Sequence, residues 1–211
     1  MNKMKIAGIS LILLGLIIIF TALTMKFLAE KKSDEMVEAY LNAIELNYSE
    51  TGTEATTEEV QVASYTESAS EKQAKIPENM LGIIKIDKIN LSAPLTEGTD
   101  NKSIMFALGH FKDTAMPGEM GNFAVAGHRS YTFGEYFSRL DELEQDDVIE
   151  VLYNGKCYKY EVTSSYVVEP EQTEVLDPTD KPVITLVTCT PKWTATHRLI
   201  VRGELKEATN G

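Results

Sequence analysis

The chain has 211 residues, 43% of them hydrophobic, which is enough for one well-packed domain with extensions and too few for two large domains. The formal net charge of −12 is uneven: residues 1–32 carry five Lys and one Glu, residues 33–79 two Lys and eleven acidic residues, and residues 80–211 thirteen basic and twenty acidic residues. The chain contains no basic stripe that could hold a phosphate backbone, so its composition argues against nucleic acid as a partner.

An uncharged apolar run, IAGISLILLGLIIIFTALTM, occupies residues 6–25. It has the roughly 20 residues that a helix needs to cross the hydrocarbon layer. A cleaved signal peptide would have a shorter apolar region ending in a small-x-small site, but Ala22 and Ala29 are each preceded two positions earlier by phenylalanine. We therefore expect an uncleaved transmembrane anchor that follows a cytoplasmic N-terminus, residues 1–5. Lysines flank the run on both sides, so charge alone leaves its orientation open.

A second helix is predicted at residues 26–48, next to the membrane, with Ser33 as a candidate N-cap. Its apolar face follows a spacing of three and four residues and consists of Val37, Tyr40, Leu41, Ile44 and Tyr48. We interpret it as a stalk rather than as a partner-binding helix. Residues 49–79 are rich in Ser, Thr and Glu and repel one another by charge, which indicates a flexible acidic linker.

Short apolar and alternating runs begin at residue 80 and define a domain over residues 80–206, followed by a tail, residues 207–211. The predicted strands are MLGIIKIDKI, NLSAPL, GNFAVAGH, PVITLVTC and RLIVRGEL, with a hairpin DVIEVLYNGKCYKYEVTSSYVV that turns at Asn154-Gly155. One helix is expected at Phe133–Leu143, with an apolar face of Phe133, Tyr136, Phe137 and Leu140. Many short strands with Gly and Pro between them predict an all-β domain, a closed or nearly closed barrel, rather than a βαβ sheet.

The chain has two cysteines, Cys157 and Cys189, in no C-x-x-C or H-x-x-x-H context. That spacing does not suit a structural zinc site, and nothing in the sequence implies a metal or cofactor. A disulfide between the two is chemically possible outside the cell. It would consume the candidate nucleophile described next, and we expect two free thiols.

Cys189 ends one predicted strand and Arg198 begins the next. If these strands are antiparallel neighbours, both residues lie at one rim of the sheet with backbones about 5 Å apart. An arginine there can stabilise the oxyanion formed when a thiolate attacks a carbonyl. A base is also needed, and the candidates are His110, His128 and His197. His128 is the best placed, because it follows an apolar strand and opens a polar loop.

The elements TLVTC, HRLIVRG and AGHRS, in this order with an N-terminal anchor, resemble the sortases, the cysteine transpeptidases of Gram-positive bacterial surfaces. The stretch GHFKDTAMPGEMGNFAVAGHR is also similar to theirs, and the resemblance covers roughly residues 80–206. It implies an eight-stranded β-barrel with short helices. It further implies that Cys189 is the nucleophile, His128 the general acid and base, and Arg198 the oxyanion or substrate-positioning residue.

The resemblance also implies the reaction and the partners. Cys189 would cleave an LPxTG-like sorting signal near the C-terminus of a secreted protein, through a thioester that an amine of a cell-wall precursor resolves. The catalytic domain would then be extracellular. In the family, the loops at residues 169–182 and 190–197 border the groove for the signal. The predicted substrate contacts are Val175, Leu176, Thr188 and Trp193.

Among the sortases the chain is most similar to class D, with some class C features. Pilin-polymerising sortases carry an Asp-Pro-aromatic lid motif before the barrel, and residues 49–79 contain no Asp. Attachment of proteins to the wall is therefore preferred over pilus assembly. A plain hydrolase and a membrane-tethered barrel that binds peptides without turnover are the remaining alternatives.

Overall fold

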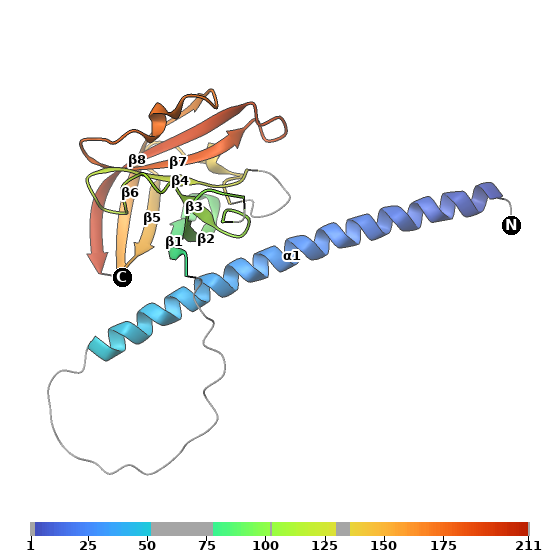
Figure 1. The fold of residues 1–211 in the computed structure, drawn as a ribbon, viewed down its shortest axis with the longest axis horizontal. Helices are drawn as coiled ribbons and strands as arrows, with labels where there is room; N and C mark the ends of the chain where they lie inside the picture. The colour runs from blue at the N-terminus through green and yellow to red at the C-terminus, as the bar shows by residue number, and fades with distance from the viewer. Residues whose placement is uncertain (1–2, 52–77, 102, 130–135, 211) are drawn as a thin grey trace, which may run out of the picture.

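The computed structural model describes residues 3–51, 78–101, 103–129 and 136–210. They form one long helix, α1 (Lys3–Thr51), and a β-barrel that lies against the C-terminal half of this helix (Figure 1). The N-terminal half of α1 extends away from the barrel. The linker predicted at residues 49–79 lies outside the described residues except at its ends, where α1 continues to Thr51.

Eight strands close into the barrel in the order β1-β2-β3-β4-β7-β8-β6-β5. The strands are β1 (Met80–Ile86), β2 (Leu91–Glu97), β3 (Leu108–His110), β4 (Gly121–Ala126), β5 (Val148–Tyr153), β6 (Lys156–Val168), β7 (Pro182–Thr190) and β8 (His197–Asn210). Three 3-10 helices complete the described elements: η1 (Asp87–Ile89), η2 (Leu140–Glu142) and η3 (Thr173–Leu176). The predicted eight-stranded barrel is confirmed.

Two neighbouring pairs in the barrel are parallel, β2 with β3 and β4 with β7, and the other six are antiparallel. Because side chains alternate across a strand, each strand presents one face to the barrel interior and one to the outside. Three neighbouring strands, β4, β7 and β8, carry the site described below. Their interior face consists of Phe123, Val125, Ile184, Leu186, Leu199 and Val201, all buried in one hydrophobic core. The outer face of β4, β7 and β8 is therefore where their remaining side chains lie.

Two predictions about the barrel domain were wrong. The tail predicted at residues 207–211 is, in its described part, the end of β8, which stays paired with β6 up to the Lys156–Asn210 pair. The helix predicted at Phe133–Leu143 is a turn followed by η2 in its described part, residues 136–143. Phe137, Leu140 and Leu143 are all buried. Their spacing of three residues matches one turn of a 3-10 helix, which explains why this apolar spacing was misread as α-helical.

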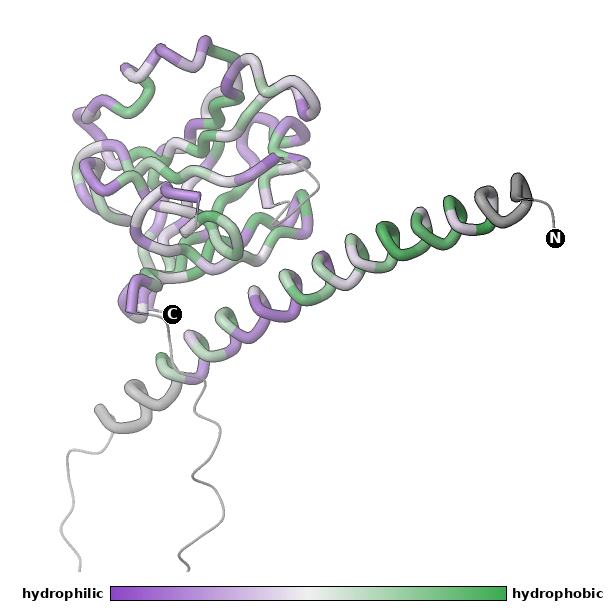
Figure 2. The backbone as a smooth tube through the Cα atoms, turned by 45° about the vertical axis from the view of Figure 1, so that its right-hand side comes forward, coloured by the Kyte–Doolittle hydropathy of each residue, from purple (hydrophilic) through white to green (hydrophobic). Residues whose placement is uncertain are grey.

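The described residues of the N-terminal half of α1 are mostly hydrophobic (Figure 2). Side chains such as Leu11, Phe20 and Leu23 are more than 60% exposed in this part of the helix. Of the described segments, this helix is the one long and apolar enough to cross a membrane. Exposed apolar side chains over this length are what a lipid environment requires, and they support the predicted anchor.

The predicted boundary between anchor and stalk helix is not visible as a break, because α1 runs uninterrupted through residues 25 and 26. Ser33 is therefore not an N-cap; it is a buried residue in the middle of the helix. The ion pairs Lys26–Glu30 and Lys31–Glu35 have the i,i+4 spacing that supports a helix as it leaves the apolar segment.

The described part of the predicted apolar face of the stalk packs against the barrel; the side chain of Tyr48 lies outside the described residues. Tyr40, with Val37 and Ile44 beside it, joins a small core with Met80 and Ile83 of β1. Leu41 lies at the border of this face and is 37% exposed. Polar contacts supplement the packing: Ser33 hydrogen-bonds Tyr136, and the Lys32 ammonium lies 4.5 Å from the centre of the Phe106 ring. The segment is thus docked on the barrel.

Candidate active site

Cys189 and Arg198 are direct register partners on the antiparallel strands β7 and β8. Both are half-buried. Since neighbouring strands are about 5 Å apart, the two side chains leave the sheet next to each other on the same face. The sequence-based prediction that this cysteine and arginine lie together at one rim is confirmed.

His128 lies on the other side of Cys189. Strand β4 is parallel to β7 with Ala126 opposite Val187, so His128 and Cys189 each follow their register partner by two residues. The backbones remain joined beyond the last paired residues, because the amide of Gly127 donates to the carbonyl of Val187 at 3.1 Å. The order across the sheet is thus His128, Cys189, Arg198, all at one end of three adjacent strands.

The three side chains belong to the outer face of the barrel. Along β7, Cys189 lies on the same face as Thr185 and Val187. The opposite face carries Ile184 and Leu186, which belong to the core. His128 is half-buried, and this desolvation lowers its pKa from the usual 6.5. The neutral imidazole is therefore the dominant form near pH 7, as a general base requires.

Thr188, a predicted substrate contact, points to the opposite face. Its side chain is 2% exposed, and its hydroxyl donates to the carbonyl of Gly127 at 2.7 Å. This bond ties the residue before Cys189 to the residue before His128. The arrangement favours a role in holding the two strand ends together over the predicted direct contact with a substrate.

The loop between β6 and β7 lies over the outer face of the barrel. The carbonyl of Val175 accepts hydrogen bonds from Asn122 of β4 and Arg202 of β8, both at 2.9 Å. Asn122 also donates to the carbonyl of Asp177 and accepts from the hydroxyl of Thr185 at 2.6 Å. This buried network fixes η3 above the sheet. Val175 thus contacts the sheet through its backbone, and its side chain is half-buried.

Leu176, the other predicted contact in this loop, lines a pocket of about 600 Å³. The pocket lies between η3, the segment that follows β2 and the segment that follows β3, and Phe111 and Pro178 contribute to its walls. The amide of Phe111 donates to the carbonyl of Ala124, two residues before the end of β4. The pocket therefore lies beside β4 before its end, whereas His128 follows the end of this strand. The pocket is on the outer side of the barrel, as η3 is.

Trp193 lies in the loop between β7 and β8 and is 81% exposed. A tryptophan ring this exposed does little to cover the edge of the barrel. The same loop holds the Arg198 guanidinium, which donates to the carbonyls of Ala195 and His197. His197 is the register partner of Thr190, the last residue of β7. Its Nε2 lies 3.2 Å from a carboxylate oxygen of Glu169.

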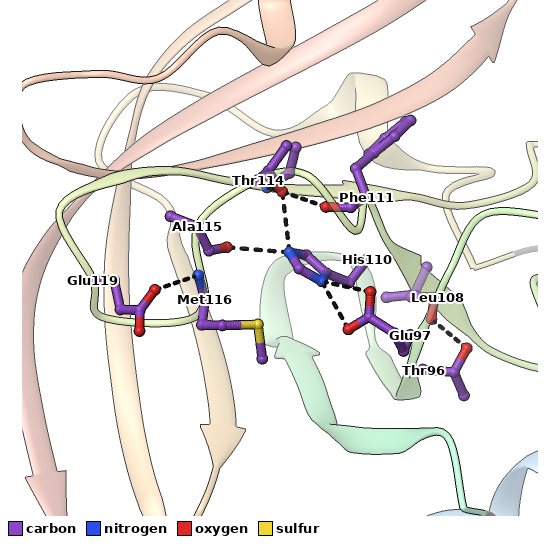
Figure 3. Close-up of polar contacts among 10 residues, drawn as sticks. Thr96, Glu97, Leu108, His110, Phe111, Thr114, Ala115, Met116 and Glu119 are labelled. Carbon is purple, nitrogen blue, oxygen red and sulfur yellow. Dashed lines mark hydrogen bonds and ion pairs between the residues drawn. The ribbon is translucent and has the colours of Figure 1, made fainter.

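His110 is a structural residue (Figure 3). It is 1% exposed, and its Nδ1 lies 3.1 Å from a carboxylate oxygen of Glu97. Its Nε2 lies 3.0 Å from the hydroxyl of Thr114 and 3.1 Å from the carbonyl of Ala115. Both ring nitrogens are therefore occupied inside the barrel, and among the three histidines this geometry leaves His128 as the one beside Cys189.

The two cysteines are free. Cys157 lies near the start of β6, and Cys189 lies across from the end of that strand, because Val168 pairs with Arg198. Eleven residues separate the two positions along β6, a length of roughly 35 Å, whereas a disulfide requires Cα atoms within about 7 Å. Among the described residues no group of three His, Cys, Asp or Glu side chains could hold a metal ion.

Several polar residues that fix the site were not predicted from the sequence. Asn122 and Thr185 had been absorbed into predicted strands as if they were ordinary strand residues, although both are fully buried. Arg129, next to His128, is also buried. The available signal was a polar residue inside an apolar strand run, which requires a hydrogen-bond partner when buried. The identity of that partner depends on tertiary structure.

Comparison with known proteins agrees with this geometry. Residues 84–206 match the sortase domain family. The chain is 30% identical to sortase A of Bacillus anthracis over 212 residues, which cover 97% of both chains. The chain is also 35% identical to sortase SrtE1 of Streptomyces coelicolor over 147 residues. That match covers 62% of this chain and 42% of the length of the relative.

A solved structure of the Clostridium perfringens sortase D5 transpeptidase is also similar. The TM-score is 0.62 at 28% sequence identity, and the match covers 83% of this chain and 98% of that one. The resemblance seen in the sequence, including the similarity to class D, is supported by these matches. The chain belongs to the sortase family of cysteine transpeptidases.

Proposed function

We propose that this protein is a membrane-anchored transpeptidase that cleaves an LPxTG-like sorting signal and joins the cleaved protein to an amine of a cell-wall precursor. The observation that carries the proposal is the order His128, Cys189, Arg198 across three adjacent strand ends on the outer face of a sortase barrel. A nucleophile, a base and an oxyanion donor then lie beside one peptide bond.

In the first half of the reaction, the sulfur of Cys189 attacks the carbonyl carbon of the threonine in the signal. Neutral His128 takes the thiol proton of Cys189 during this attack. The C–N bond to the next residue then breaks, and the leaving amine takes that proton from His128. The product is a thioester. Arg198 donates to the oxyanion of the tetrahedral intermediate, after its guanidinium turns from the carbonyls of Ala195 and His197 to which it now donates.

In the second half, the acceptor amine attacks the thioester. Neutral His128 takes a proton from the attacking nitrogen, the C–S bond breaks, and Cys189 leaves as a thiolate. Burial of His128 lowers the pKa of its imidazole and so disfavours the imidazolium form that the leaving amine needs as a proton donor.

The groove for the signal is bounded by the loops that follow β6 and β7. The fixed position of η3 supports Val175 and Leu176 as contacts for the apolar part of the signal, since the Val175 carbonyl is held from two strands. The exposed ring of Trp193 supports an aromatic contact at the other side of Cys189.

The anchor sets where the reaction takes place. The exposed apolar half of α1 supports a single membrane span, with residues 1–5 in the cytoplasm and the barrel outside. Secreted proteins with C-terminal signals and wall-precursor amines are both found on that side. The docked part of α1 would then hold the barrel close to the membrane surface, where lipid-linked precursors lie.

The test is mass spectrometry of the full chain, in detergent, mixed with a panel of LPxTG-like peptides. We expect a thioester adduct on Cys189 that hydroxylamine removes. Cys189→Ala should give no adduct, while Cys157→Ala, a matched control at the far end of β6, should give as much as the unmodified chain. Turnover that survives in Cys189→Ala would contradict the proposal, and peptide binding without any adduct in the unmodified chain would favour a barrel that only binds peptides.

Added amines separate the remaining alternatives. Oligoglycine represents a wall-precursor amine, and a lysine-containing peptide represents the side chain that a pilin polymerase would use. We expect oligoglycine to increase product formation over water. Preference for the lysine peptide would favour pilus assembly, and no response to either amine would favour a hydrolase.

A further inference from the structure

Arg129 follows His128 directly and is buried, with 6% of its side chain exposed. A buried guanidinium is unusual, because the charge loses hydration unless partners replace it. Strand β4 ends three residues before Arg129, so this residue is not buried as part of the sheet. Its contacts must explain its position.

Two arms of the guanidinium have partners on different parts of the barrel. One terminal nitrogen donates to the hydroxyl of Thr190 at 2.7 Å. The other lies 2.9 Å from a carboxylate oxygen of Asp141 in η2. The Nε is buried without a hydrogen-bond partner among the described residues.

These contacts join the two segments that carry the reacting groups. Arg129 is covalently next to His128, and Thr190 is covalently next to Cys189. Asp141 belongs to η2, which begins at the fully buried Leu140 of the core. The bridge therefore connects the histidine segment and the cysteine strand to each other and to a fixed part of the barrel.

We propose that Arg129 is a positioning residue that holds the imidazole of His128 in reach of the Cys189 sulfur by bridging Thr190 and Asp141. The inference rests on the proposed function for its role in turnover. The planar fork of a guanidinium can donate to two acceptors in fixed directions, whereas a lysine ammonium on a flexible stem cannot reproduce that geometry. Charge alone is thus insufficient for this role.

The test compares Arg129→Lys and Thr190→Val with the unmodified full chain in detergent. Thr190→Val removes one arm and keeps the size of the side chain. We expect kcat for peptide acyl transfer to decrease by about tenfold in Arg129→Lys, with KM changed less than about twofold, because a misplaced base affects the chemical step. Arg139→Lys, on an exposed arginine paired with Glu142, is the matched control and should change neither.

A double-mutant comparison separates positioning from simple stability. In a His128→Gln background there is no base left to position, so Arg129→Lys should cause no further loss of residual activity. A loss that persists undiminished in that background would overturn the proposal. So would a chain with a lowered Tm and an unchanged kcat.

A second readout does not depend on the substrate. Iodoacetamide alkylation near pH 7, followed peptide by peptide, reports the thiolate character of Cys189, with Cys157 as an internal reference. We expect Arg129→Lys and Thr190→Val to slow alkylation of Cys189 by about threefold or more and to leave Cys157 unchanged. Equal slowing at both thiols, or at neither, would contradict the role of Arg129. This result holds even if no peptide in the panel is cleaved, in which case only the proposed function fails.

Discussion

The hydroxyl of Tyr40, in the long N-terminal helix, donates a hydrogen bond to the backbone carbonyl of Leu81 in β1 at 3.0 Å. The two residues are 41 positions apart in the chain. The ring of Tyr40 is buried against Met80 and Ile83, and this burial raises its pKa. The long N-terminal helix is therefore joined to the first strand of the catalytic barrel.

Substitution of Tyr40 should weaken this joint in two steps. Tyr40→Phe removes only the hydrogen bond and is expected to lower the free energy of unfolding by about 1 kcal/mol. Tyr40→Ala also removes the buried ring and is expected to lower it by about 3 kcal/mol. Urea unfolding of the detergent-solubilised chain, followed by circular dichroism, measures both.

Leu41→Ala is the control for these two variants, because Leu41 is adjacent in sequence and 37% exposed. It should change the free energy of unfolding by less than about half of the Tyr40→Ala effect. Equal effects of Tyr40→Ala and Leu41→Ala would show that the helix does not dock through this face.

Most strands could be predicted from the sequence because their side chains alternate between core and surface. The hairpin at Asn154-Gly155 is an example: Asn154 and Gly155 both have positive φ, as a tight hairpin turn requires. Strand β3 has only three residues, Leu108–His110, and a segment this short carries no readable alternation. It is stabilised by its neighbours β2 and β4 rather than by its own pattern.

The site could be predicted in part. The Cys189 and Arg198 pair follows from two strand ends and one turn, which are local features. The bonds from Asn122 to η3 and from Arg129 to Thr190 join residues 53 to 61 positions apart. Nothing in a single sequence indicates which buried donor meets which distant carbonyl, because many closures of the barrel are compatible with the same strand pattern.

The lowered pKa of His128 predicts the pH dependence of the reaction. Burial disfavours the charged imidazolium, so the acid limb of kcat/KM should have its midpoint below the usual 6.5. At alkaline pH the site lacks the proton that the leaving amine needs, so the profile should be bell-shaped. Below pH 6.5 the unfolded chain binds a proton at this histidine before the folded chain does, so the free energy of unfolding should also decrease as pH falls. Initial rates of thioester formation between pH 5 and 9 measure the first effect.

His197→Gln provides the comparison for the pH profile. His197 faces Glu169 on the surface loop and is separate from the end of β4. Its substitution should leave the acid limb in place, whereas His128→Gln should abolish the limb together with most of the activity. If the acid limb moved in His197→Gln, the limb would report His197 and not His128.

The hydrogen bonds of Asn122 predict a binding defect. Asn122→Asp keeps the acceptor for the Thr185 hydroxyl but loses the donors to the carbonyls of Val175 and Asp177. A carboxylate facing two carbonyl oxygens also repels them, so η3 should move away from the sheet. If this loop contacts the signal, KM should rise by about tenfold with a smaller change in kcat.

Thr185→Val is the matched variant for Asn122→Asp. It removes the hydroxyl that donates to Asn122 and leaves both bonds from Asn122 to the loop in place. It should therefore affect stability more than KM. A fall in kcat at constant KM in Asn122→Asp would show that the network acts on the chemical step and not on the groove.

The position of Arg198 predicts a loss of activity in Arg198→Lys, although this substitution keeps the positive charge. Its guanidinium donates to the carbonyls of Ala195 and His197 at 3.3 and 3.0 Å, and it must turn toward Cys189 to reach an oxyanion. Arg198→Lys keeps the charge but lacks the planar set of donors, so kcat/KM should fall by about 10² or more, mainly through kcat. Steady-state rates of acyl transfer and the rate of Cys189 alkylation are measured together, with Arg139→Lys as the matched control. Slow transfer with normal alkylation is expected, because an oxyanion donor acts on the intermediate and not on the resting thiol. Retention of kcat/KM in Arg198→Lys would assign this arginine to charge balance alone.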